Sequence, residues 1–196
     1  CLYGSVGACP IMGTANSMQC ATESLGLALP GSASALAVSA EKMRFAEETG
    51  RQIMELIRRD IRPTDIVTRE AIENCITVLM SSGGSTNLII HLTAIARRAG
   101  FELKLEEFQK ISERTRVLVD VKPSGKGTVG IEFHQAGGVP ALMKELEPLL
   151  HTGVLTVTGK TLKENLQNVQ QSCRPDVIAP FSKPLKPEGG IAVLYG

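Results

Sequence analysis

Tryptophan is absent from this chain of 196 residues, and aromatic residues make up only 4% of it. Proteins that bind single-stranded nucleic acids stack the bases on aromatic side chains, which this sequence can offer at few places. The 21 lysines and arginines are balanced by 20 aspartates and glutamates, and neither sign forms a long run. The net charge of +1 therefore gives no basic surface for phosphates. We expect no nucleic-acid partner.

Long apolar runs are also missing. No stretch approaches the roughly 20 residues that a membrane-spanning helix needs, and no basic segment followed by an apolar one opens the chain.

The five cysteines are odd in number and widely spaced, which is untypical of a disulfide framework and favours a reducing compartment. We expect a soluble, cytoplasmic protein without a membrane partner.

Apolar positions repeat every three or four residues along much of the chain, which predicts amphipathic helices. We expect these helices over residues 14–29, 39–59, 68–80, 88–99, 103–115 and 140–150. Ser39 and Thr68 are expected to cap two of them, and Thr161 a further short helix. The segment 88–99 is apolar nearly all round, so we expect it to lie at the centre of the fold.

Short apolar runs predict strands over residues 116–121, 153–159 and 189–196. Strands separated by helices favour an α/β fold, here a helix-rich layered domain with a small, mainly parallel sheet. Residues 167–190 are rich in proline and polar side chains, which is typical of a linker. Because the chain opens in a loop and ends on a strand-like run, we expect it to be a partial domain cut from a larger protein.

Cys9 lies in the stretch "GACPIMGTANSM", a loop of small residues that leads directly into a predicted helix. The N-terminus of a helix carries partial positive charge and free N–H groups, which favour a thiolate. No Cys-x-x-Cys pair accompanies Cys9, so a self-contained zinc site is not expected. Cys9 is the first candidate for chemistry.

The stretch "SSGGSTN" is the second candidate. Its two glycines would let a ligand approach the backbone, and Ser85, Thr86 and Asn87 would offer it hydroxyl and N–H groups at a helix start. The alternative is an ordinary turn between helices, capped by Ser85.

The histidines and the second cysteine of this region carry weaker signals. His91 lies on the apolar helix and is expected to be buried, whereas His134 lies in an expected loop and could have a function. Cys20 is expected to pack against the core. We assign none of the three to the site.

Eight motifs occur in a characteristic order. They are "GACPIMGTANSM", "ESLGLALPGSAS", "RDIRPTDIVTREAIENCI", "GGSTNLIIHLTAIARRAG", "VLVDVKPSGK", "HQAGGVPALMKEL", "LTVTGKTLKEN" and "KPEGGIAVLYG". Together they resemble the dihydroxy-acid dehydratase family, which includes phosphogluconate dehydratase and the sugar-acid dehydratases. The resemblance implies that residues 1–166 are the later part of an N-terminal α/β, cluster-binding domain. It also implies that residues 167–196 are a linker and the first strand of a C-terminal β-rich domain.

The resemblance further implies a hydro-lyase that converts a 2,3-dihydroxy acid to a 2-keto acid in branched-chain amino-acid biosynthesis. Members use an iron-sulfur cluster (2Fe-2S or 4Fe-4S) as a Lewis acid for the leaving hydroxyl and Mg²⁺ to hold the substrate. The cluster-binding cysteine of the family motif falls on Cys9. The other cluster and metal ligands and the base are expected outside this chain, which alone is expected to be inactive. The whole enzyme is expected to be a homo-oligomer.

Two alternatives stay open. The first is a sugar-acid (aldonate or phosphogluconate) dehydratase, because "GTA" in the cysteine motif is typical of sugar-acid enzymes whereas "TAN" is typical of the amino-acid pathway enzyme. The second is a cluster-free α/β module for assembly or binding, because a cluster needs three or four protein ligands and only Cys9 is assigned.

Overall fold

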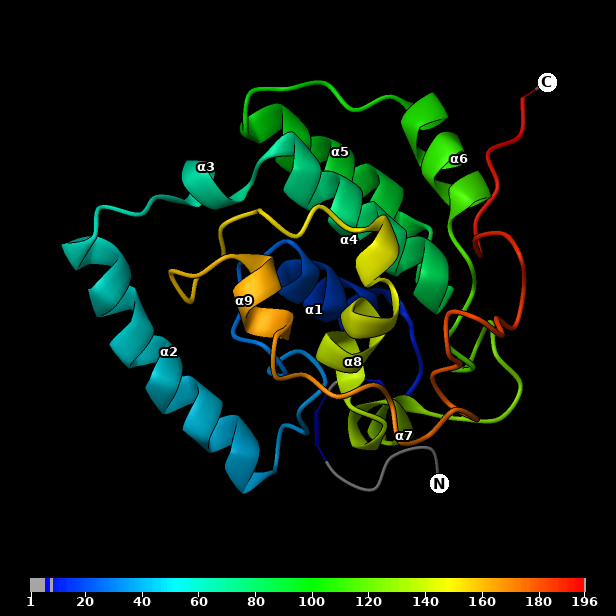
Figure 1. Ribbon diagram of the computed structural model, residues 1–196, viewed down its shortest axis with the longest axis horizontal. Coiled ribbons are helices and arrows are strands. Elements are labelled where there is room, and N and C mark those ends of the chain that lie inside the picture. The colour runs from blue at the N-terminus through cyan, green and yellow to red at the C-terminus, as the bar shows by residue number, and fades with distance from the viewer. Residues whose placement is uncertain (1–5, 8, 196) are drawn as a thin grey trace.

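Helices dominate the protein in a computed structural model that describes residues 6, 7 and 9–195 (Figure 1). They are, in chain order, α1 (Thr14–Ser24), α2 (Ala40–Arg58), α3 (Pro63–Ile66), α4 (Arg69–Ser82), α5 (Asn87–Arg98), α6 (Leu105–Arg114), α7 (Gly130–Gln135), α8 (Gly138–Glu145), the 3-10 helix η1 (Glu147–Leu149) and α9 (Leu162–Leu166). The helix-rich part of the predicted architecture is confirmed. Among the described residues, no helix is both long and apolar enough to cross a membrane.

The predicted helix caps are present. The hydroxyl of Ser39 accepts the Lys42 N–H at 3.1 Å at the start of α2, and the hydroxyl of Thr68 accepts the Ala71 N–H at 3.2 Å at the start of α4. Thr161 caps α9 in the same way. Each bond satisfies a backbone donor that the first turn of a helix leaves free.

Helix α4, and not α5, is the central helix. Eleven of the fourteen residues of α4 are buried, and α4 packs against α1, α5 and α6. Helix α5 buries only three residues, spaced four apart on one face (Leu88, Leu92 and Ala96), while Ile90 is 70% exposed. The prediction of a central 88–99 helix is therefore wrong, because its apolar residues on the other face meet solvent. His91 is exposed as well, contrary to expectation.

Helix α1 lies between two apolar clusters. Cys20 on α1 belongs to the cluster built mainly by α8 and residues 118–121, which confirms its expected packing. The next residue, Ala21, belongs to the cluster formed by α4, α5 and α6. Packing on both sides fixes the position of α1 and hence of the loop that precedes it.

The predicted parallel sheet is not formed by the residues that the structure describes. Their β-pairings are isolated bridges, and only the one between Val121 and Thr128 is parallel. The backbone N–H groups of Leu118 and Val119 both donate to the Ser81 carbonyl at the end of α4. A strand needs its N–H groups for a neighbouring strand, so this segment cannot extend a ladder there.

The other two predicted strands are also irregular. The Thr156 N–H donates to the Lys160 carbonyl across a tight turn, in which Gly159 has a φ of +72°. Near the C-terminus, the N–H groups of Gly189 and Gly190 donate to carbonyls of α6 and α4. Backbone groups that bond to helix ends and turns are not available for a sheet.

Residues 167–190 pack against the 117–121 segment. Val177, Ile178 and Ala179 are buried, and the Ala179 N–H donates to the Leu118 carbonyl at 2.7 Å. This stretch therefore contributes to the same core, and the predicted domain boundary near residue 166 stays a prediction.

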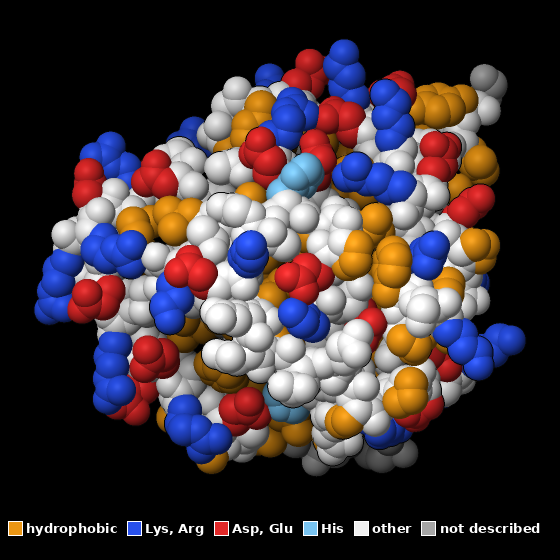
Figure 2. All heavy atoms as spheres, in the orientation of Figure 1, with side chains coloured by type: hydrophobic (Ala, Val, Ile, Leu, Met, Phe, Trp, Pro, Cys, Tyr) orange, Lys and Arg blue, Asp and Glu red, His pale blue; other side chains and the backbone are white. Residues whose placement is uncertain are grey.

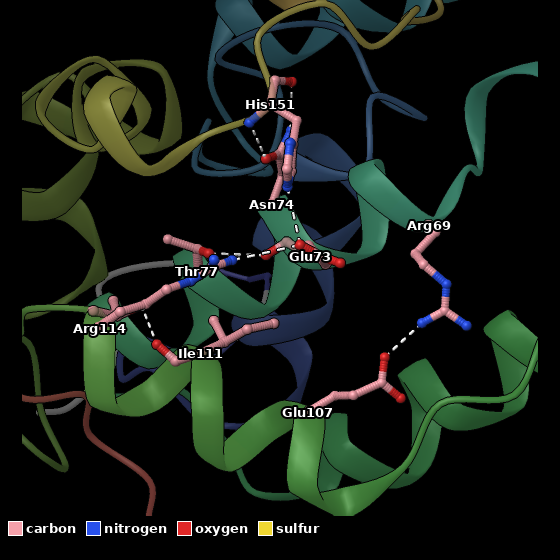
Figure 3. A network of polar contacts seen from close by, with 9 residues as sticks. Arg69, Glu73, Asn74, Thr77, Glu107, Ile111, Arg114 and His151 are labelled. Atoms are coloured by element: carbon pink, nitrogen blue, oxygen red, sulfur yellow. Dashed lines mark hydrogen bonds and ion pairs between the residues drawn. The ribbon is translucent and has the colours of Figure 1, made fainter.

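Polar contacts tie α4 to its neighbours (Figure 3). The carboxylate of Glu73 lies 2.9 Å from His151 Nε2 and 3.5 Å from the Arg114 guanidinium of α6. The Asn74 side chain donates to the His151 carbonyl and accepts the His151 N–H. The face seen in Figure 2 mixes acidic and basic side chains without a large patch of one sign.

Glu23 is a buried carboxyl that shapes the loop after α1. Its two carboxylate oxygens accept the N–H groups of Gly31 at 2.7 Å and Ala33 at 2.8 Å. Burial raises the pKa of Glu23 from 4.5 to about 7, although the two N–H donors favour the charged form. Glu23 is therefore a titratable group to which the backbone of this loop is bonded.

We predict that Glu23 makes the protein less stable as the pH rises from 4.5 to 7. Between these values the folded state holds a proton on Glu23 that the unfolded state has released, so the free energy of unfolding falls with pH by on the order of 3 kcal/mol. Thermal unfolding of the wild type and of Glu23→Gln across this range measures the effect. The variant should show the flatter profile, and equal slopes would contradict the prediction.

Candidate functional site

The Cys9 loop is folded back over the first turn of α1. The side-chain amide of Asn16 on α1 donates to the carbonyl of Cys9 and, at 2.7 Å, to that of Ile11. One side chain thus satisfies two carbonyls that the loop geometry would otherwise leave without a partner. The position of Cys9 relative to α1 is set by Asn16, the asparagine of the "TAN" motif.

The same loop is held on its other side by the chain around α7. The Met12 N–H donates to the Lys122 carbonyl at 2.6 Å, and the Gly130 N–H donates to the Pro10 carbonyl at 2.5 Å. A Cβ on Gly130 would lie 3.2 Å from the Pro10 oxygen, so a side chain there would push the two segments apart. The "KPSG" loop and the start of α7 therefore clamp the loop that carries Cys9.

Cys9 is half-buried and lines a pocket of about 230 Å³. The polar side chains of the wall are Asn16, Gln19, Ser34 and Lys42, and the apolar ones include Met12 and Phe133. Mixed walls with a few polar groups are typical of small-molecule sites. The pocket has room for a small group beside the thiol.

Cys20 lines the same pocket but differs in its chemistry. Burial, followed by the nearby Glu23 and Cys75, raises the pKa of Cys20 far above its usual range, and burial raises the pKa of Cys75 to about 12. Both thiols therefore stay protonated near neutral pH, and a protonated thiol is a poor metal ligand. Of the described cysteines that line this pocket, Cys9 is the more accessible one.

The donor set around Cys9 fits an iron-sulfur cluster only in part. Cys9 offers one soft ligand that opens into a pocket, as such a cluster requires. Within residues 6, 7 and 9–195, no three histidine, cysteine or acidic side chains lie close enough together to hold a metal ion. Cys1 lies outside the described residues. The described chain thus fits as the source of one ligand.

A hydrogen-bonded chain of three side chains begins at Ser34 in the pocket wall and leads away from the pocket. His134 on α7 lies with Nδ1 2.9 Å from the Ser34 hydroxyl and with Nε2 2.9 Å from the Glu41 carboxylate of α2. Gly138, with a φ of +58°, leaves the space for Ser34, because a Cβ there would lie 2.4 Å from the Ser34 oxygen. The ring thus fixes a hydroxyl that lines the pocket. The sequence analysis does not identify Ser34. Ser34 and His134 lie in the motifs "PGSAS" and "HQAGG", which meet here in the structure.

The "GGSTN" stretch contacts another face of the first turn of α1. The hydroxyls of Ser85 and Thr14 lie 3.0 Å apart, and the Asn87 amide donates to the Thr14 hydroxyl at 2.8 Å. The Ser85 N–H donates to the hydroxyl of Ser17 at 2.9 Å. The structure thus brings this motif and the Cys9 loop to the same helix start.

The three residues of "STN" do not line the Cys9 pocket. Thr86 and Asn87 are exposed, and the Ser85 hydroxyl also accepts the Asn87 N–H at 3.3 Å, as a local turn would. A role of Ser85, Thr86 and Asn87 toward the substrate stays a prediction.

Three glycine-containing motifs meet at the end of α4. Gly83 closes this helix with a φ of +60°, and its carbonyl accepts the Ser124 hydroxyl of "KPSG" at 2.7 Å. A Cβ on Gly190 of "KPEGG" would lie 3.0 Å from the Gly83 Cα. Backbones approach this closely only where side chains are absent.

Known proteins resemble this chain over nearly its whole length. Residues 1–165 match the family described as dihydroxy-acid/6-phosphogluconate dehydratase N-terminal. Proteins named dihydroxy-acid dehydratase are similar to the chain at 48% identity in Sulfurisphaera tokodaii, over 97% of this chain and 34% of that protein, and at 47% in Pyrococcus abyssi, again over 97% and 34%. A third, from Methanosarcina barkeri, is 45% identical over 98% of this chain and 35% of that protein.

The chain therefore belongs to the dihydroxy-acid/6-phosphogluconate dehydratase family, as its motifs indicate. It spans about a third of the length of these curated relatives.

We predict that Gly84→Val destabilises the protein by about 1–3 kcal/mol, the usual cost of overpacking. A Cβ on Gly84 would lie 2.8 Å from Leu79 Cδ1 and 3.0 Å from the Ser17 hydroxyl, so the turn would be pushed off α1. Thermal unfolding measures the loss. Gly153→Ala is the matched control, because a Cβ there meets nothing within 4 Å; equal melting temperatures for the two variants would refute the prediction.

Proposed function

We propose that the whole protein containing this chain is a hydro-lyase that removes water from a 2,3-dihydroxy carboxylic acid to give a 2-keto acid. The names of relatives 45–48% identical to the chain support this reaction. The observation that carries the proposal is the half-buried Cys9 thiol in the wall of a pocket. Asn16 and the clamp around α7 hold the loop of Cys9 at the N-terminus of α1. Branched-chain amino-acid biosynthesis in the cytoplasm is part of the proposal.

We infer that Cys9 is one ligand of an iron-sulfur cluster, of either 2Fe-2S or 4Fe-4S type, with Mg²⁺ close by. When bound, these groups supply the Lewis acidity that the departing hydroxyl and the substrate carboxylate require. The remaining ligands and the catalytic base are proposed to lie in the two thirds of the family protein that this chain does not span.

The residues of this chain have their own tasks in such a site. Lys42 brings a positive charge to the pocket wall, and its Nζ is oriented by a 2.7 Å bond to the Ser32 carbonyl. A positive charge there attracts a carboxylate substrate. The Ser34 hydroxyl, oriented by His134, can donate to or accept from a substrate hydroxyl. Met12 and Phe133 exclude water from the side of the pocket nearest the core.

The parts of the architecture that the described residues do not form belong to the same proposal. A small, mainly parallel sheet would be formed by strands from the rest of the protein, and residues 167–196 would lead into a β-rich domain. The whole enzyme would be a homo-oligomer.

A sugar acid, such as an aldonate or phosphogluconate, is the second candidate substrate. The family description names 6-phosphogluconate, and "GTA" in the Cys9 motif supports this alternative. Turnover of a branched-chain dihydroxy acid, measured beside that of phosphogluconate and an aldonate, distinguishes the two candidates. A cluster-free binding module would turn over none of them.

We predict that Cys9→Ser in the whole protein abolishes dehydration and lowers the bound iron, while the melting temperature of the cluster-free form changes little. The replacement keeps the size of the side chain but removes a soft ligand. Cys173→Ser is the control, because Cys173 is exposed and lies outside the pocket. A Cys9→Ser enzyme with normal iron content and activity would overturn the assignment.

A further inference from the structure

Ser34 is the member of the chain Ser34, His134 and Glu41 that lines the Cys9 pocket. His134 and Glu41 lie behind it and do not line that pocket, and the Glu41 side chain is 40% exposed. A ligand in the pocket therefore meets the Ser34 hydroxyl and not the two groups behind it. What this hydroxyl offers a ligand depends on where its proton points.

The backbone that leads to Ser34 is held by two other side chains. The Ala33 N–H donates to the buried carboxyl of Glu23 at 2.8 Å. The Ser32 carbonyl accepts a hydrogen bond from Lys42 Nζ at 2.7 Å. These contacts place the backbone beside Ser34, which leaves the bond to His134 to set the direction of the hydroxyl proton.

The Glu41 carboxylate decides which ring nitrogen of His134 carries a proton. A carboxylate only accepts hydrogen bonds, so His134 Nε2, 2.9 Å from Glu41, must be the donor. A neutral imidazole has one donor and one acceptor nitrogen, and Nδ1 is then the acceptor. The Ser34 hydroxyl, 2.9 Å from Nδ1, must donate to it. The one proton of the hydroxyl is thereby used within the wall.

We infer that Ser34 presents only oxygen lone pairs to the pocket and accepts a hydrogen bond from a hydroxyl group of the substrate. Lys42, in the same wall, brings the positive charge for the carboxylate. A carboxylate or phosphate oxygen beside Ser34 is disfavoured, because two acceptors would face each other. His134 and Glu41 act as positioning residues. The inference deepens the proposed function, on which it rests, by assigning the hydrogen-bond partner of a substrate hydroxyl.

The proton on the His134 ring is the first test, and it needs no catalytic activity. Nitrogen-15 NMR of the whole protein, labelled in histidine and recorded at pH 8, distinguishes a ring nitrogen that carries a proton from one that does not. The signals that disappear in His134→Gln belong to this residue. We expect a proton on Nε2 and none on Nδ1. A proton on Nδ1 would overturn the inference.

The response of matched ligands to Ser34→Ala is the second test. The probes are 2,3-dihydroxybutanoate and the two analogues in which fluorine replaces either the 2-hydroxyl or the 3-hydroxyl, because fluorine cannot donate a hydrogen bond. Ser34→Ala in the whole enzyme should lower kcat/KM for the dihydroxy acid about 3- to 10-fold, the usual effect of one neutral hydrogen bond. The inhibition constant of one fluorinated analogue should not change, because that analogue lacks the donor that Ser34 accepts.

Ser182→Ala is the matched control, because Ser182 is exposed and lies outside the pocket; it should change none of these constants. A wild type that dehydrates no hydroxy acid would refute the proposed function, whereas the NMR result would still decide the orientation of the Ser34 hydroxyl. Equal losses for the dihydroxy acid and both analogues in Ser34→Ala would mean that Ser34 donates instead of accepting. No loss for any of the three would mean that Ser34 does not touch the substrate, and either result would contradict the inference.

Discussion

The pair of hydrogen bonds from Asn16 to the Cys9 loop is the interaction on which the site depends. A loop that carries a metal-binding thiol must hold that thiol in one place before the metal arrives, or the cost of ordering the loop is taken from the binding energy. Asn16 orders the loop from the first turn of α1, since its amide bonds the carbonyls of Cys9 and Ile11. The position of the loop is therefore set by the position of α1.

Packing in turn places α1 with little freedom. The helix lies between two apolar clusters, and the same first turn bonds the "GGSTN" turn through Thr14 and Ser17. Glycines at positions 83 and 84 leave room for neighbouring side chains, and glycines at positions 130 and 190 let neighbouring backbones come close. These motifs thus let several loops meet at the start of α1 and at the end of α4.

The sequence predicts local features well and distant contacts poorly. The caps at Ser39, Thr68 and Thr161 could be predicted because each bond spans only three residues. The helices α4 and α5 could be predicted, but not which is central, because the three-dimensional arrangement decides which apolar face finds a partner. The bonds of His134 to Ser34 and Glu41 join residues 100 and 93 positions apart. The spacing of residues in the sequence does not indicate contacts over such distances. The apolar run at 116–121 predicts part of a sheet, yet the N–H groups of Leu118 and Val119 bond to the end of a helix.

The central claim is that this arrangement presents the Cys9 thiolate to iron inside the pocket beside α1. Anomalous diffraction at the iron absorption edge, from crystals of the whole protein purified without oxygen, tests it most directly. The account predicts an iron peak within bonding distance of the Cys9 sulfur, with Asn16 still bonded to the loop. Iron bound elsewhere, with the Cys9 sulfur free and the pocket filled only by solvent, would contradict it.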